Sequence, residues 1–171
     1  RISVKTVKRN ILMLIRTSSL IYDDRVRKEC LSIVENANTF KLDICSFENV
    51  TSDFSISNTK IYRQPIFLRK VFPSNSMVFL KTIEMYFRYF LVMKKGSYRI
   101  HWVHNFESIG IIPFLYIYNV FTRKSRLKII WDQHELPPPF FYKNVFGKKV
   151  YKAISSMCDD IVMACADRAE F

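Results

Sequence analysis

Short, uninterrupted apolar runs recur along this chain and alternate with segments of helical periodicity. The first is Ile-Leu-Met-Leu-Ile at residues 11–15, a pattern typical of a strand buried on both faces of a parallel sheet. The repeated order of strand, helix and strand predicts an α/β fold: a doubly wound, mostly parallel, Rossmann-like sheet flanked by helices. Further strands are expected at 40–47, 59–62, 99–104, 128–132 and 161–164. Helices are expected at 24–37, 76–95, 108–121 and 145–158.

Length and glycine content exclude several classes of protein. A chain of 171 residues fits one domain with a substantial core, and 49% apolar with 25% charged residues is a globular composition. With only 3 Gly, and no GxGxxG or GxxxxGK(S/T) after the first strand, dinucleotide and P-loop sites are disfavoured. GxSxG and HExxH do not occur either, and a Ser-His-Asp triad has no local motif behind it.

No metal site is expected from the sequence. None of the four cysteines has CxxC or other metal-ligand spacing, and all are expected to be small buried hydrophobes in a reducing compartment. His101 and His104 would lie on opposite faces of one strand, so they cannot share an ion, and His101 is expected to pack. Asp132 and His134 share a face, but two ligands without a third make a weak metal site.

The formal charge of +12 is concentrated in one segment. Residues 60–100 contain nine Lys or Arg and one acid, Glu84, so this segment carries +8 of the total. Such a segment suits a polyanion: an anionic lipid surface, a lipid pyrophosphate, a nucleotide or a nucleic acid. A solvated basic surface is the alternative. The cations expected to form a membrane or polyanion patch are Arg69, Lys70, Lys81, Arg88, Lys94 and Lys95.

The helix expected at 76–95 has a narrow polar stripe, formed by Lys81, Glu84 and Arg88, and is otherwise almost entirely apolar or aromatic. A sheet covers only one side of such a helix. The remaining aromatic side chains are expected to be extra core, a partner surface or a membrane-facing rim. The longest uncharged run, 108–122, is shorter than the roughly 20 residues of a spanning helix, so no transmembrane helix is expected.

Polar residues follow three of the expected strands, at the sheet edge where open parallel sheets bind ligands. We expect them to form one polar rim. Its candidate members are Thr17, Ser18, His104, Asn105, Glu107, Asp132, His134 and Glu135.

Four segments resemble family 4 glycosyltransferases, in the family's order and over almost the whole chain. His-Asn-Phe-Glu-Ser at 104–108 is similar to the family's H-D-x-D segment. Ile-Ile-Trp-Asp-Gln-His-Glu-Leu-Pro at 129–137 is similar to its Y-D-x-H-E-x-x-P segment. Asp-Arg-Val-Arg-Lys-Glu at 24–29 resembles D-P-R-V-R-R-E at the start of the family's first helix. Residues 160–166 resemble the strand that precedes the interdomain linker.

The resemblance implies a GT-B enzyme with two Rossmann-like domains that face each other across a cleft. Residues 1–171 would be the N-terminal, acceptor-side domain, and the C-terminal domain that binds the nucleotide sugar is expected to be absent from this chain. Family members generally transfer with retention, without a metal or other cofactor. His104 would be the catalytic residue, bonded to a sugar hydroxyl or to developing charge. Asp132, His134 and Glu135 would shape the rim, with a structural role equally open for Asp132 and Glu135.

The chain departs from the family pattern at three places. Thr17-Ser18-Ser19 stands where many members have a Gly-rich loop, so hydroxyl contacts would replace a close backbone approach. Asn105 replaces the common Asp and removes a charge, while Asp24 stands where Pro is usual.

The expected function is sugar transfer from a nucleotide sugar to a lipid-linked or polysaccharide acceptor. Because the chain opens with a basic stretch rather than a signal peptide, we expect a cytoplasmic protein, peripheral to the inner, anionic face of the cell membrane. The isolated domain is expected to be inactive. The alternative is a non-catalytic protein- or membrane-docking module. Nucleic-acid binding rests on charge and aromatics alone, without an RRM, OB or HTH signature, and is not expected.

Overall fold

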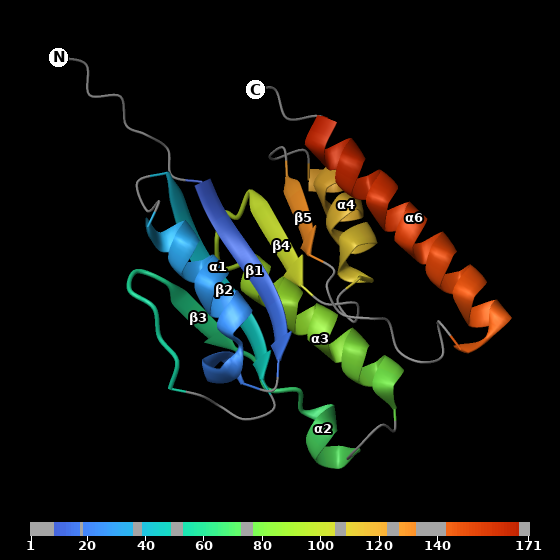
Figure 1. Cartoon of the computed structure of the whole chain (residues 1–171), viewed down its shortest axis with the longest axis horizontal. Coiled ribbons are helices and arrows are strands. Elements are labelled where there is room, and N and C mark those ends of the chain that lie inside the picture. Colours follow the sequence, from blue (N-terminus) through green and yellow to red (C-terminus); the bar gives the residue numbers. More distant parts are fainter. Residues whose placement is uncertain are drawn as a thin grey trace.

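The core of the molecule is an all-parallel sheet with strand order β3-β2-β1-β4-β5 (Figure 1). The computed structural model describes residues 9–17, 19–35, 39–48, 53–72, 77–104, 109–122, 127–132 and 143–167. The strands are β1 (Arg9–Thr17), β2 (Phe40–Glu48), β3 (Lys60–Arg63), β4 (Ile100–His104) and β5 (Lys128–Asp132). The α/β, Rossmann-like fold expected from the sequence is thereby confirmed.

Helices cover both faces of this sheet. They are η1 (Leu20–Tyr22), α1 (Asp24–Glu35), α2 (Leu68–Val71), α3 (Val78–Met93), α4 (Ile111–Thr122) and α6 (Val145–Asp167). α1 packs on one face, in a core cluster with the odd-numbered residues of β1. α3, α4 and α6 pack on the other face, in a cluster with Leu12 and Leu14 (Figure 1). β1 is therefore buried on both faces, as its unbroken apolar run predicts.

The prediction of a strand at 161–164 is wrong, because these residues belong to α6, which continues to Asp167. The buried side chains of Cys158 and Cys165 are seven residues apart and lie on one side of the helix, with Ile161 and Val162 packed between them against the core. A short apolar run fits a buried helix as well as a buried strand, and here the packing of α6 against α4 and β5 decides. The likeness of residues 160–166 to a family strand is lost with it.

α3 turns its polar stripe inward. Lys81 is buried on the same side as Met85 and Tyr89. Glu84 pairs with Arg88 at 2.7 Å, and its two carboxylate oxygens accept hydrogen bonds from the backbone N–H groups of Phe67 and Leu68, at the start of α2. The stripe is therefore used to hold α2, and the apolar side of α3 faces outward.

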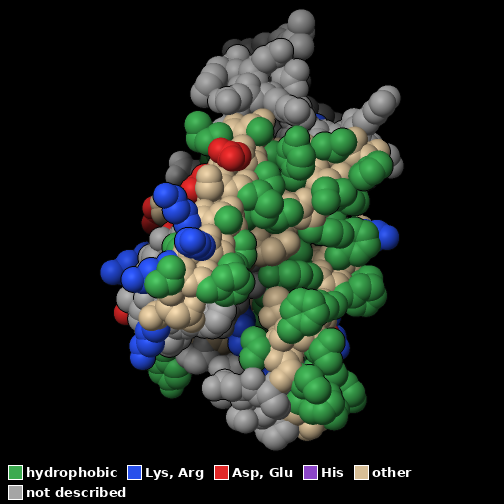
Figure 2. Space-filling view, turned by 90° about the vertical axis from the view of Figure 1, so that its right-hand side faces the viewer, with side chains coloured by type: hydrophobic (Ala, Val, Ile, Leu, Met, Phe, Trp, Pro, Cys, Tyr) green, Lys and Arg blue, Asp and Glu red, His purple; other side chains and the backbone are tan. Residues whose placement is uncertain are grey.

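The outward sides of α3 and α4 form a continuous apolar face. The rings of Phe90 on α3 and Phe114 and Tyr118 on α4 meet edge to face and join the two helices. Figure 2 shows hydrophobic side chains covering most of this side of the molecule, with basic side chains along its edge. No helix of the described residues is both long and apolar enough to cross a bilayer. The exposed members of this face are Phe79, Leu80, Ile83, Phe87, Leu91, Phe114, Ile117, Val120 and Phe121.

Candidate functional site

The strand order reverses between β1 and β4, since the chain runs outward from β1 to β3 and then returns to β4. Ligands of open parallel sheets bind beyond the carboxyl ends of the strands at such a switch point. Here these ends are Thr17 and His104. Of the other residues expected at this rim, Asp132 ends β5. The remaining members, Ser18, Asn105, Glu107, His134 and Glu135, lie outside the described residues.

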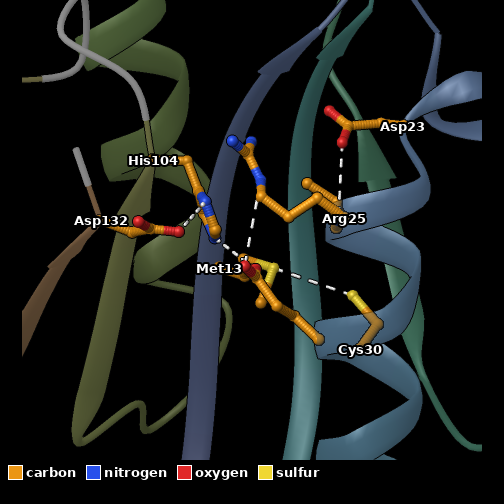
Figure 3. A network of polar contacts seen from close by, with 8 residues as sticks. Met13, Asp23, Arg25, Cys30, His104 and Asp132 are labelled. Carbon is orange, nitrogen blue, oxygen red and sulfur yellow. Dashed lines mark hydrogen bonds and ion pairs between the residues drawn. The ribbon is translucent and has the colours of Figure 1, made fainter. Parts of the chain in front are cut away.

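His104 and Asp132 are direct neighbours across the pairing of β4 with β5. Nδ1 of His104 lies 3.3 Å from Oδ2 of Asp132 (Figure 3). The imidazole is stacked on the Trp102 indole, with ring centroids 5.5 Å apart and planes 11° apart. The expected proximity of the two strand ends is thus found, but the His104 side chain is 0% exposed rather than open to a cleft.

Glu29 completes this cluster and was not identified from the sequence. Its Oε2 lies 3.6 Å from Nε2 of His104, and its Oε1 lies 3.9 Å from Nε of Arg25, one turn earlier on α1. α1 begins with a cap in which Oδ1 of Asp23 accepts a hydrogen bond from the N–H of Val26 at 3.3 Å, worth about 1 kcal/mol. The sequence carried two signals for Glu29: it ends the family-like segment 24–29, and it precedes Cys30 on the helix face that meets the sheet.

Burial and mutual repulsion set the protonation states of the cluster. Burial lowers the pKa of the His104 imidazole to about 4, although the Asp132 carboxylate alone would raise it. Burial and, after it, the Asp132 carboxylate raise the pKa of Glu29 above its ordinary value. At neutral pH, His104 is therefore neutral, and a neutral imidazole can donate a proton at one nitrogen and accept one at the other. The two contacts place this neutral imidazole between two carboxyl groups.

Within the part of the chain that the structure describes, these three residues form a group that could hold a metal ion. One ligand atom from each of Glu29, His104 and Asp132 lies within 4.8 Å of the others. This is a better ligand set than any the sequence indicated, because α1 supplies the third ligand. The guanidinium of Arg25 beside Glu29 opposes a bound cation, and it also lowers the pKa of His104.

His101 packs in the core, as expected. Its side chain is fully buried on the opposite face of β4, and Nδ1 lies 2.7 Å from the hydroxyl oxygen of Tyr89. Burial lowers the pKa of His101 to about 3. His101 therefore belongs to the packing beneath α3 and not to the cluster around His104.

The six cations expected to form one patch are distributed over different places. Arg69 and Lys70 lie together on α2, whereas Lys94 and Lys95 lie beyond the opposite end of α3. Lys94 Nζ lies over the Phe90 ring, 4.4 Å from its centroid. Lys81 is buried on α3, and Arg88 is paired with Glu84.

Comparison with known proteins adds no family to this description. No model of a protein family matches the chain, and no curated protein matches it.

Proposed function

We propose that this chain is the acceptor-side half of a glycosyltransferase. It would transfer a sugar from a nucleotide sugar to a lipid-linked or polysaccharide acceptor, with retention and without a metal. The observation that carries the proposal is the cluster of His104, Asp132 and Glu29, next to the switch point between β1 and β4. Asp132 comes from the segment with the most specific resemblance to family 4 glycosyltransferases. His104 begins another of the four segments, and Glu29 ends the one that resembles the start of the family's first helix.

The burial of the three side chains suggests different roles for them. Asp132 and Glu29 keep 28% and 22% of their side chains exposed, so their carboxylates can bond sugar hydroxyls. His104 lies beneath them and is proposed as the positioning residue, which holds both carboxylates and relays a proton between them. Preorganised polar groups of this kind typically contribute a hundredfold or more to the rate.

His104→Asn in the complete polypeptide that contains this chain tests the proposal. We expect kcat for sugar transfer to fall by about a hundredfold, and the pH dependence of the remaining activity to change, since the titrating relay is gone. His101→Asn is the matched control, because it removes a buried histidine from the same strand but from the other face. It should lower stability and leave kcat and its pH profile unchanged. Equal loss in both variants would assign His104 a purely structural role and contradict the proposal.

The exposed apolar face of α3 and α4 favours a second candidate function, docking on an anionic membrane. Such a face, bordered by cations, is the chemistry of proteins that lie on a bilayer surface. Lys94 borders it at the Phe90 ring, and Lys148, Lys149 and Lys152 are exposed on α6, which packs beside α4. Membrane docking is compatible with sugar transfer to a lipid-linked acceptor. If the chain takes no part in sugar transfer, membrane docking alone would make it a non-catalytic docking module.

A further inference from the structure

A second polar hollow lies at the carboxyl ends of β2 and β3. It is an open cavity of about 430 Å³. Glu48 at the end of β2, Arg63 at the end of β3, and Arg69 and Lys70 on α2 contribute its charged lining. Ligand pockets commonly have volumes of this order.

The lining of this cavity is positive. Glu48 is the one carboxylate among its lining residues, against three cations. Its side chain is 3% exposed, with Oε2 lying 3.4 Å from Nε of Arg63 and Oε1 accepting a hydrogen bond from the N–H of Leu20 at 2.7 Å. The Glu48 carboxylate therefore neutralises the charge of the Arg63 guanidinium, and the cavity lining retains a surplus of two positive charges.

The scaffold holds Arg63 in place and anchors the backbone of the helix that carries Arg69 and Lys70. Arg63 donates a hydrogen bond from Nη2 to the carbonyl oxygen of Phe54, and the next residue, Gln64, donates from its backbone N–H to the carbonyl of Ser46 at 2.8 Å. On the other side of the cavity, Glu84 of α3 accepts the hydrogen bonds that anchor α2. Because Arg63 is already held, its ordering costs little entropy when an anion binds, whereas Lys70 is exposed and must be ordered by the anion.

A phosphate or pyrophosphate group fits this lining. Guanidinium groups bond phosphate oxygens in pairs, and lysine adds a point charge. The cavity opens at the same edge of the sheet as His104, and β2 and β4 are separated only by β1. Two strand spacings put their axes about 10 Å apart, a span that a phosphate-linked sugar can cover.

Exposed apolar side chains lie beside this cavity as well as on the face of α3 and α4. Phe67, just before α2, and Val71 on α2 are both exposed, and α2 packs against α3, whose Phe79 and Ile83 are exposed as well. A ligand that carries both a phosphate and an apolar chain would use both surfaces. We infer that the cavity binds the phosphate or pyrophosphate group of a lipid-linked molecule, which, if the proposed function holds, is the sugar acceptor.

Calorimetric titration of the 171-residue chain tests the inference, with inorganic pyrophosphate and farnesyl pyrophosphate as probes. We expect both to bind, farnesyl pyrophosphate more tightly, and Arg69→Gln/Lys70→Gln to weaken both at least tenfold. Arg27→Gln/Lys28→Gln removes the same charge from exposed positions of α1, on the other face of the sheet, and should leave both affinities unchanged. Thermal unfolding of each variant verifies that the fold is kept.

Three outcomes would overturn the inference. The first is wild-type affinity in the α2 variant, which would show that the pyrophosphate binds elsewhere. The second is an equal loss in the control variant, since binding would then follow net charge alone. The third is binding to phosphatidylglycerol vesicles without binding to either pyrophosphate, which would make the cations a contact for lipid headgroups. These measurements use no nucleotide sugar. Pyrophosphate binding without sugar transfer would support the phosphate-binding cavity and contradict the glycosyltransferase function. Sugar transfer that depends on His104, without pyrophosphate binding, would support the glycosyltransferase function and contradict the phosphate-binding cavity.

Discussion

Nδ1 of His104 lies 3.3 Å from Oδ2 of Asp132, and the two residues are paired at the ends of adjacent parallel strands. Neither residue could be replaced without changing the other's surroundings, because the imidazole is fully buried and Asp132 covers part of it. The contact joins two segments that the sequence marked separately. It also ties the stability of the sheet edge to the protonation of one side chain.

The stability of the chain should fall as the pH is lowered from about 6.5 to about 4. The fold depresses the pKa of His104 to about 4 from an ordinary value near 6.5, so the unfolded chain binds a proton more readily in this window. The contribution of His104 is fully present above pH 6.5 and is lost as the pH falls through 4; it amounts to about 3 kcal/mol at most. Denaturant unfolding at several pH values measures it. His104→Asn should flatten the profile, and an unchanged slope would contradict the assignment.

Glu29→Gln should stabilise the chain at pH 7, by up to about 1 kcal/mol. The pKa of Glu29 is raised by burial and by Asp132, so the ionised carboxylate opposes folding above its ordinary pKa and the neutral amide does not. The same substitution should lower sugar transfer by the complete polypeptide, since residues that serve function are often not the most stable choice. Chemical denaturation and a transfer assay on one preparation would measure both. Lower stability together with unchanged activity would make Glu29 a structural residue.

Metal ions should neither stabilise the chain nor support activity. Glu29, His104 and Asp132 have ligand atoms close enough to share an ion, but Arg25 adds an opposing positive charge beside Glu29. We expect the same melting temperature with and without Zn²⁺ or Mn²⁺, and the same transfer rate after treatment with EDTA. A rise in melting temperature that disappears in Asp132→Asn would instead identify a metal centre.

Phe79→Ser/Phe87→Ser should reduce binding to anionic vesicles about tenfold. The two rings are 75% and 61% exposed on the apolar face, so their removal costs little folding stability, within about 0.5 kcal/mol, while a bilayer loses two apolar anchors. Sedimentation with phosphatidylglycerol vesicles measures the bound fraction. Ile21→Ser/Tyr22→Ser serves as the control. It removes exposed apolar side chains from η1, which precedes α1 on the other face of the sheet. Vesicle binding that is insensitive to the first pair would exclude this face as the contact.

The elements themselves were largely predictable from the sequence. The run at 11–15 indicated a strand buried on both faces, and β1 is one. The strand ends at His104 and Asp132 were also correct, because an apolar run ends where the chain leaves the core. The error at 161–164 arose because four apolar residues satisfy either period, and only the packing of α6 against α4 and β5 distinguishes them.

The candidate site was predictable in part. Parallel strands bring their carboxyl ends to one edge, so the meeting of His104 with Asp132 followed from topology. The burial of the His104 side chain did not follow from topology, because it depends on which segments cover the end of the strand and not on the strand itself. Glu29 and the cavity lined by Arg63 and Arg69 were missed for a similar reason, since each depends on a helix that packs beside the strands.

The amino-acid sequence alone determined which segments form the five strands, and which polar residues end β1, β4 and β5. These properties are local, because hydrophobic periodicity and the residue type at the end of a strand are set by residues close together in the chain. The tertiary structure alone decided that α3 turns its polar stripe toward α2 and its aromatic side outward, and that α1 delivers Glu29 to His104. The rotation and placement of a helix depend on the sum of its contacts with distant segments, and no local pattern encodes that sum.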